Sequence, residues 1–133
     1  MKKRKIYCPY CGANATLHTS SYIYGEAAKT NGLVYVCDRY PKCDAYVGAH
    51  QKSRLPMGTL ANGDLRNKRI QAHKAFDWLW KSGRMKKWQA YKWMQGVFAL
   101  NERQAHIAMF SEYMCDRLIA ACNQAYRNMN SAA

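Results

Sequence analysis

The chain carries two short cysteine-bearing segments, CPYCG at residues 8–12 and CDRYPKC at residues 37–43. A Cys-x-x-Cys-Gly turn directs two thiolates toward one point, and its glycine permits the backbone conformation that closes the turn. Because Zn²⁺ prefers four soft ligands in a tetrahedron, a second pair of thiolates must arrive from another turn. Four sulfur ligands without a fifth donor make a closed site, so Cys8, Cys11, Cys37 and Cys43 predict one structural zinc ion.

The alternative for these four cysteines is that they are free thiols or disulfides. The charged start at residues 1–5 is followed by Ile6-Tyr7-Cys8-Pro9 rather than by the apolar stretch of a signal peptide. No apolar run approaches the length of a membrane span. We therefore expect a reducing cytoplasm, which favours metal binding over disulfides. Cys115 and Cys122 are interpreted as buried thiols of one helix, with a redox pair or a second metal site as the alternative.

The second cysteine pair has five intervening residues instead of the usual two. In this respect residues 37–43 resemble the second knuckle of zinc ribbons in the C-terminal region of type IA DNA topoisomerases. There, a Tyr-Pro-x-Cys ending follows the third cysteine in the same way. The resemblance covers roughly residues 6–48, and it implies a ribbon of short strands and an association with DNA.

The chain changes character along its length, which predicts an α+β fold. Residues 1–50 are rich in β-branched and aromatic residues, with strands predicted over 16–24, 33–36 and 45–50. Residues 51–63 form a turn-rich connector, and residues 64–133 form a helical unit. Helices are predicted over 64–82, 86–95 and 111–126, with Gly83 ending the first and Ser111 beginning the last. We expect an N-terminal zinc ribbon of short antiparallel strands packed on a C-terminal bundle of about three helices.

The chain is strongly basic, with 21 Lys and Arg against 8 Asp and Glu and a formal net charge of +13. One Zn²⁺ bound by four thiolates lowers this charge by two, to +11. Such an excess predicts an anionic partner, most commonly nucleic acid, and the alternative is a solvated basic surface without a dedicated partner. The sequence contains no nucleophile elbow, phosphate loop or paired-carboxylate motif. We therefore predict a protein that is not an enzyme, with no small-molecule substrate and no membrane partner.

The residues predicted to contact nucleic acid lie in the ribbon and the start of the connector. Bases are expected to stack on the tyrosines, while the cations meet phosphates, as in proteins that bind single strands. Because no major-groove recognition helix is evident, single-stranded or distorted DNA is the expected ligand. The predicted contacts are Lys2, Lys3, Arg4, Lys5, Tyr10, Arg39, Tyr40, Lys42, Tyr46, Lys52 and Arg54.

A second candidate site lies in the helical half. His73 and Asp77 are four residues apart on one predicted helix, so they can hydrogen-bond, and His106 precedes the last helix. Together these three residues suggest a nuclease or a second metal site. The preferred interpretation is ordinary core histidines tied to carboxylate or backbone groups.

The aromatic residues of the helical half divide into two groups. Phe76, Trp80, Trp88 and Tyr91 have helical spacing and are predicted to lie in the core. Trp78 and Trp93 are instead flanked by lysines. An exposed tryptophan among lysines can stack on an unpaired base, or it can anchor a protein partner.

The whole chain looks like a small family of bacterial and bacteriophage proteins described as zinc-finger-containing domains. The family implies a phage or prophage origin, and therefore a role in replication, recombination or host takeover within the host cytoplasm. It implies no particular activity, so a module that binds and modulates a host enzyme is the alternative function. The matching segments are CPYCG (8–12), CDRYPKC (37–43), LPMGTLA (55–61), AHKAFD (72–77) with Trp80, AYKW (90–93) and AHIAMF (105–110).

Overall fold

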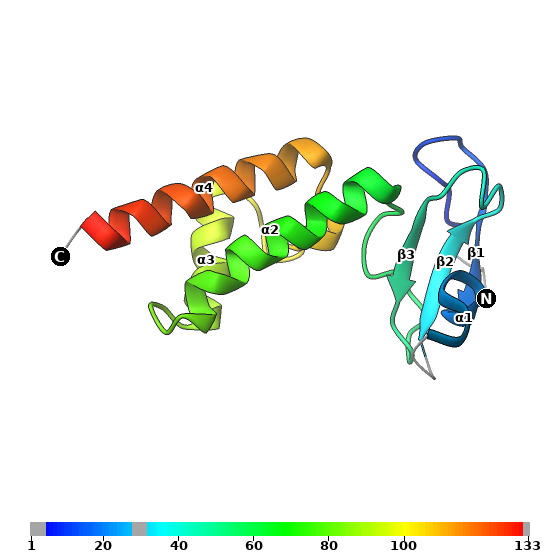
Figure 1. Cartoon of the computed structure of the whole chain (residues 1–133), viewed down its shortest axis with the longest axis horizontal. Coiled ribbons are helices and arrows are strands. Elements are labelled where there is room, and N and C mark those ends of the chain that lie inside the picture. The colour runs from blue at the N-terminus through cyan, green and yellow to red at the C-terminus, as the bar shows by residue number, and fades with distance from the viewer. Residues whose placement is uncertain (1–4, 28–31, 132–133) are drawn as a thin grey trace. The chain divides into compact units, whose positions relative to one another are not determined.

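The computed structural model describes residues 5–27 and 32–131, and the chain divides into two compact units, Met1–Asp64 and Leu65–Ala133. The three strands lie in the first unit and the long helices lie in the second (Figure 1). The predicted α+β fold is therefore confirmed.

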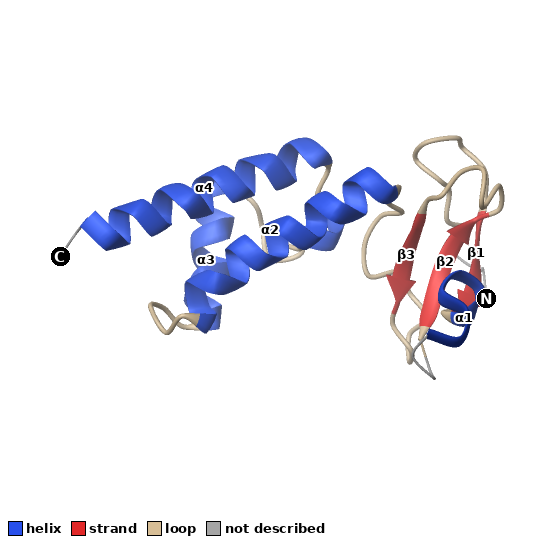
Figure 2. Cartoon of the chain, viewed as in Figure 1, coloured by secondary structure: helices blue, strands red, loops and turns tan. Residues whose placement is uncertain are grey.

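One antiparallel sheet forms the first unit, with strand order β1-β2-β3 (Figure 2). Its strands are β1 (Ala15–Thr19), β2 (Leu33–Cys37) and β3 (Tyr46–Ala49). The register places Leu17, Tyr35 and Val47 side by side across the sheet. Since side chains alternate along a strand, Thr16, Val36 and Tyr46 share the opposite face. The first face carries the metal-binding core, and the second carries an aromatic cover.

A short helix stands where the sequence predicts the end of the first strand. The strand expected over residues 16–24 stops at Thr19, and residues Ser21–Tyr24 form α1, followed by the 3₁₀ turn η1 (Gly25–Ala27). Alternating Tyr22-Ile23-Tyr24 fits a strand, but the helical turn brings both tyrosine rings back onto the sheet. Tyr22 stacks on His18 with ring centres 4.0 Å apart, and Tyr24 meets Tyr46 edge-on. Tertiary packing here overrides local propensity.

The aromatic cover explains why the central strand is buried on both faces. Val34 and Val36 are only 4% and 1% exposed, although they lie on the face opposite the cysteines. His18 and Tyr46 flank these valines on the neighbouring strands and hold the rings of α1 above them. A three-stranded sheet gains stability when both faces are covered.

The connector is part of the first unit's structure. Isolated bridges pair Ala49 with Pro56 and Tyr46 with Ala61, so the segment runs back along the outer edge of β3. Leu60 is 2% exposed and joins the core of this unit. Gly48 makes room for Met57, whose sulfur lies 3.4 Å from where a Cβ would stand.

The second unit contains α2 (Gly63–Lys81), α3 (Lys87–Phe98), the short turn η2 (Ile107–Met109) and α4 (Glu112–Ser131). Two predicted ends are confirmed, because Gly83 takes a left-handed φ of 82° after α2 and the Ser111 hydroxyl accepts from the Met114 N–H at the start of α4. Helices α3 and α4 run past their predicted ends at residues 95 and 126.

The helical unit has its own apolar core. One charged side chain, that of Arg69, is buried with it, and its Nε donates to the Phe110 carbonyl at 3.0 Å. On α4, Cys115 and Cys122 are buried as predicted, together with Leu118, whereas Tyr126 is exposed. The buried apolar residues of this unit are Leu65, Ala72, Phe76, Leu79, Ala90, Met94, Ala105, Ile107, Phe110, Cys115, Leu118 and Cys122.

Candidate metal centre and nucleic-acid interface

Two backbone turns aim the four ribbon cysteines at one point. In the first turn the Gly12 N–H donates to the Cys8 carbonyl at 2.9 Å, and Gly12 takes the left-handed φ of 77° that its lack of a side chain permits. In the second, the Tyr40 N–H donates to the Cys37 carbonyl and the Cys43 N–H donates to the Arg39 carbonyl. The ladder between β1 and β2 sets the turns side by side, because Ala15 pairs with Cys37.

The sulfur geometry fits one tetrahedral zinc ion. All four Sγ atoms lie within 4.8 Å of one another, with Cys8 to Cys43 at 3.6 Å and Cys11 to Cys37 at 3.4 Å. A Zn–S bond of about 2.3 Å gives tetrahedron edges of about 3.8 Å. A disulfide instead needs about 2.05 Å between sulfurs, and all six cysteines are free. Over the described residues this is the one cluster of His, Cys, Asp or Glu suited to a metal.

The surroundings of the four thiols make the metal site part of the core. Cys8 and Cys37 are almost fully buried and cluster with Ala45, Val47 and Leu60. Burial raises the pKa of the Cys37 thiol to about 12, whereas a hydrogen bond from the Ala13 backbone lowers the pKa of Cys11 to about 7. Zinc binds thiolates, so metal binding releases protons and holds these groups in their charged form. Four sulfur ligands complete a closed site, and the zinc is structural.

The structure places the predicted nucleic-acid contacts at two ends of the sheet. Lys5, Arg39 and Lys42 lie in or next to the cysteine turns, where β2 ends. Lys52 and Arg54 follow β3 and lie at the opposite end, because Ala49 pairs with Leu33 at the start of β2. Four residue steps of strand separate these ends by roughly 13 Å. Lys2, Lys3 and Arg4 fall outside the described residues.

The tyrosines predicted to stack on bases make contacts within the first unit. The Tyr10 hydroxyl accepts from the Asn62 N–H at 3.2 Å. Tyr40 lies against Tyr22, and the Tyr46 hydroxyl accepts a hydrogen bond from the Tyr24 hydroxyl at 3.2 Å. The more open rings of this cover are Tyr22 and Tyr24, which are 49% and 53% exposed. Strand-like alternation gave no signal that a helix would place these two rings on the sheet.

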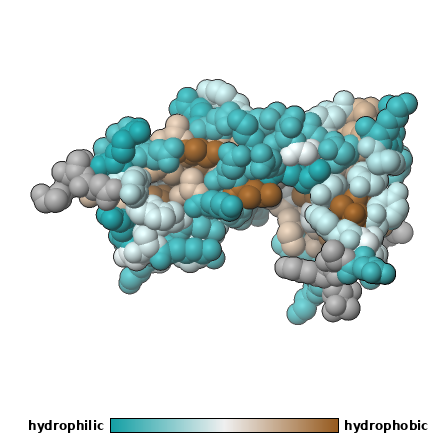
Figure 3. Space-filling model, viewed as in Figure 1, coloured by the Kyte–Doolittle hydropathy of each residue, from teal (hydrophilic) through white to brown (hydrophobic). Residues whose placement is uncertain are grey.

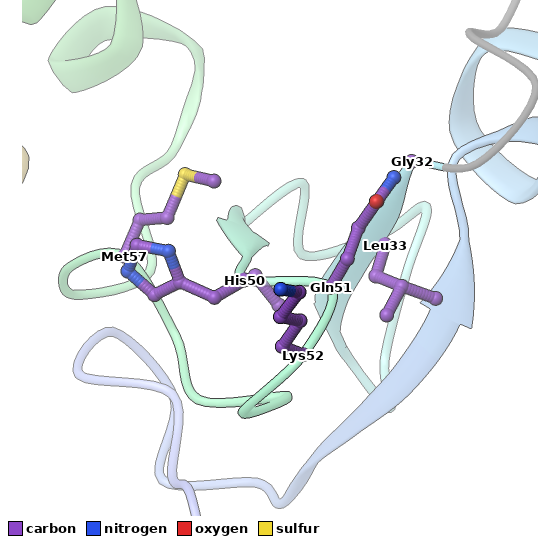
Figure 4. A pocket seen from close by; sticks show the side chains of 7 residues that line it. Gly32, Leu33, His50, Gln51, Lys52 and Met57 are labelled. Carbon is purple, nitrogen blue, oxygen red and sulfur yellow. The ribbon is translucent and has the colours of Figure 1, made fainter.

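A hollow of about 500 Å³ lies at the end of the sheet that carries Lys52 (Figure 4). In Figure 4 the imidazole of His50 and the thioether of Met57 lie on one side, with Gln51 and Leu33 on the other. Its lining consists of Gly32, Leu33, Ala49, His50, Gln51, Lys52 and Met57.

The three residues of the second candidate site form no metal-binding group. His73 Nδ1 lies 3.8 Å from Asp77 Oδ1, and Lys81 Nζ lies 3.8 Å from the other carboxylate oxygen. His106 instead lines a hollow beside α3, together with Trp88. The carboxylate of Asp77 is thus shared between an exposed histidine and an exposed lysine.

Two tryptophans of the helical unit differ from the prediction. Trp88, expected in the core, is 61% exposed on the first turn of α3. Trp78, expected to be exposed, is half-buried with its ring against Tyr126 and under the Arg84 guanidinium. The predicted helix is present, but its core-facing side is the side of Ala90 and Met94.

The fold and the sulfur cluster define a four-cysteine zinc-ribbon protein whose second unit is helical. The chain belongs to the family of zinc-finger-containing domains, whose model matches residues 4–125. Searches among curated proteins and among solved structures found no match. Within the described ranges, no helix combines the length and the apolar character needed to cross a bilayer.

Proposed function

We propose that this zinc-binding protein is a phage-encoded, nonenzymatic nucleic-acid-binding protein that prefers single-stranded or distorted DNA. The observation that carries the proposal is the surface beside the metal site. There, the half-exposed ring of Tyr22 lies against Tyr40, which belongs to the same turn as Arg39 and Lys42. Neither of these two cations forms an ion pair with another described residue.

The two acidic residues in and beside the second cysteine turn each accept a hydrogen bond from another part of the first unit. Asp38 accepts from the Thr16 hydroxyl at 2.6 Å, and Asp44 accepts from the Gly63 N–H at 3.0 Å. Arg39 and Lys42 lie on the same turn and are exposed. When a cation without a carboxylate partner contacts a phosphate, counterions condensed on the nucleic acid are released, and this release favours binding.

Charge of one sign extends over both units. The first unit has nine Lys and Arg against four Asp and Glu, a net charge of +5, and the second has twelve against four, a net charge of +8. Figure 3 shows a face on which hydrophilic side chains predominate over each unit, with small apolar patches among them. This composition suits a polyanion better than an apolar partner surface.

The tyrosines supply the preference for unpaired bases. Tyr22 stacks in parallel on His18, at 10° between ring planes, and 49% of the residue remains exposed to a base. Base-on-aromatic stacking contributes about 1–3 kcal/mol per base and needs a base that is free of its duplex partner. The closed zinc site supports a binding role, since it offers no open position for a substrate.

The test is fluorescence anisotropy with a labelled 20-nucleotide single strand, the matched duplex and a duplex with a central bubble, at several salt concentrations. The Arg39→Ala/Lys42→Ala variant should bind more weakly and show a salt slope lower by roughly two, because two phosphate contacts are lost. Lys74→Ala/Arg103→Ala removes the same charge from exposed positions of the second unit and is the matched control.

Two results would contradict the proposal. One is wild-type protein at micromolar concentration that binds none of the three probes at low salt. The other is an equal loss of affinity in the two double variants. The ribbon surface would then contribute to binding only through the overall positive charge of the protein. If a nuclease-treated lysate also yields one stoichiometric host protein, the host-modulating alternative replaces the proposal.

A further inference from the structure

A second hollow lies in the helical unit, beside α3. Its volume is about 580 Å³, within the range of small-ligand sites in proteins. It combines two lysines, two aromatic rings and three other polar side chains. The lining residues are Lys87, Trp88, Tyr91, Lys92, Gln95, Glu102 and His106.

We propose that this hollow binds one nucleotide, with its base stacked on Trp88 and its phosphate held by Lys87 and Lys92. For a nucleotide within a DNA or RNA strand, the inference rests on the proposed function and adds a contact site in the helical unit. The same chemistry is offered by a free nucleotide, and the experiment below distinguishes the two sources.

The periodicity of α3 separates the hollow from the core. Trp88, Tyr91, Lys92 and Gln95 stand at positions i, i+3, i+4 and i+7, so they form one stripe along the helix. The buried positions of α3, Ala90 and Met94, form a different stripe. The exposure of Trp88 therefore follows from its position on the helix.

The local charge favours an anion. The lining has a net positive charge, because Lys87 and Lys92 stand against the single carboxylate of Glu102. Lys87 lies with its Nζ 5.0 Å from the centre of the Trp80 ring, a cation–π contact that helps to fix its position at the rim. Among the described residues, neither Lys87 nor Lys92 forms an ion pair. A phosphate at this rim would meet two ammonium groups.

The other polar groups of the lining suit a base edge. Gln95 offers both a donor and an acceptor, and the Glu102 carboxylate accepts hydrogen bonds of the kind that ring N–H groups, such as N3–H of thymine, and exocyclic amino groups donate. An apolar ligand would leave these groups and two lysines without partners, at a desolvation cost. A ligand with a flat ring, hydrogen-bonding edges and a phosphate offers partners to the aromatic rings, the polar side chains and the lysines of the lining.

The experiment compares Trp88→Leu with wild-type protein, using AMP, dTMP and a labelled ten-residue oligothymidine as probes. Because Trp88 is 61% exposed, its replacement leaves the core intact, which circular dichroism verifies. The matched control is Tyr113→Leu, an aromatic ring that is 67% exposed on α4 and lies outside the hollow. Lys92→Glu provides a second variant, in which the charge and not the ring is changed.

Loss of one base–aromatic stack should weaken oligonucleotide binding about 5- to 140-fold in Trp88→Leu, and Tyr113→Leu should match wild type. A second outcome is that AMP or dTMP binds and loses affinity in Trp88→Leu, while oligothymidine does not bind. The hollow then takes a free nucleotide, so the inference holds and the proposed function is contradicted. If wild type and Trp88→Leu bind oligothymidine equally, the inference is overturned while the proposed function stands. The inference is also overturned if no nucleotide binds and a host protein, captured from nuclease-treated lysate by wild type, is lost in Trp88→Leu.

Discussion

Replacement of Cys37 by serine tests whether zinc holds the first unit together while the second folds on its own core. Cys37 is 1% exposed and lies at the junction of β2, the second cysteine turn and the ribbon core. A structural four-cysteine site contributes about 10–16 kcal/mol, which equals or exceeds the whole stability of a typical domain. The variant should therefore lose its zinc, and residues 5–64 should unfold.

The structure also gives the size of the spectroscopic change. Helices α2, α3 and α4 contain 19, 12 and 20 residues, whereas α1 contains 4. Loss of residues 5–64 thus removes 6 of 55 α-helical residues, which are the four of α1 and the first two of α2. Circular dichroism at 222 nm should fall only slightly, while amide resonances of residues 5–64 collapse in the nuclear magnetic resonance spectrum.

Metal content measured by mass spectrometry completes the assay, with one zinc per wild-type chain and almost none in Cys37→Ser. Cys122→Ser is the matched control, because Cys122 is equally buried in the helical unit and lies outside the sulfur cluster. It should keep its zinc and the dispersed resonances of the sheet. Retention of a full equivalent of zinc by Cys37→Ser, or loss of the helical signal together with the sheet, would refute the reasoning.

Three further predictions concern single positions. Phe76→Ala removes a fully buried ring that packs edge-on against Tyr91 at 5.0 Å, so denaturant unfolding should show a loss of about 3–5 kcal/mol, and a loss below 1 kcal/mol would contradict the assigned core. Gly12→Ala forces a side chain onto a φ of 77° without any clash, so it should cost about 1–2 kcal/mol and weaken zinc roughly 5- to 30-fold in a chelator competition; unchanged affinity would count against the turn geometry. Burial raises the pKa of Cys122 to about 12, so this thiol stays protonated at pH 8 and should react with Ellman's reagent only as the helical unit unfolds; immediate reaction in native protein would disprove its burial.

Much of the architecture follows from spacing alone. The intervals between the four cysteines predict the metal site, because zinc prefers four ligands in a tetrahedron and each of the two turns supplies two thiolates. The three long helices follow from their apolar period, and their start and stop signals at Ser111 and Gly83 act through local hydrogen bonds and backbone conformation. These features depend on residues near one another in sequence, which is why they can be predicted.

The features missed by sequence reasoning depend on contacts between distant residues. Tyr22 and Tyr24 alternate as in a strand, and only the hydrophobic face formed by Val34 and Val36 makes a helix the better arrangement. Trp88 has helical spacing, but the side of α3 that packs inward is decided by the other helices. The hollow beside Trp88 also draws on Glu102 and His106, which follow α3 in the chain.

The path of the connector decides where the sheet can grow. Strand β3 is paired with β2 on one side and bridged by Pro56 and Ala61 on the other, so its outer edge is covered. The outer edge of β1 is covered only at its start, where the Ala15 N–H donates to the Ile6 carbonyl at 2.8 Å. A ribbon cut after residue 50 would in addition expose the outer edge of β3, and open edges recruit other chains. The residues between the last strand and the first long helix thus protect the protein from self-association.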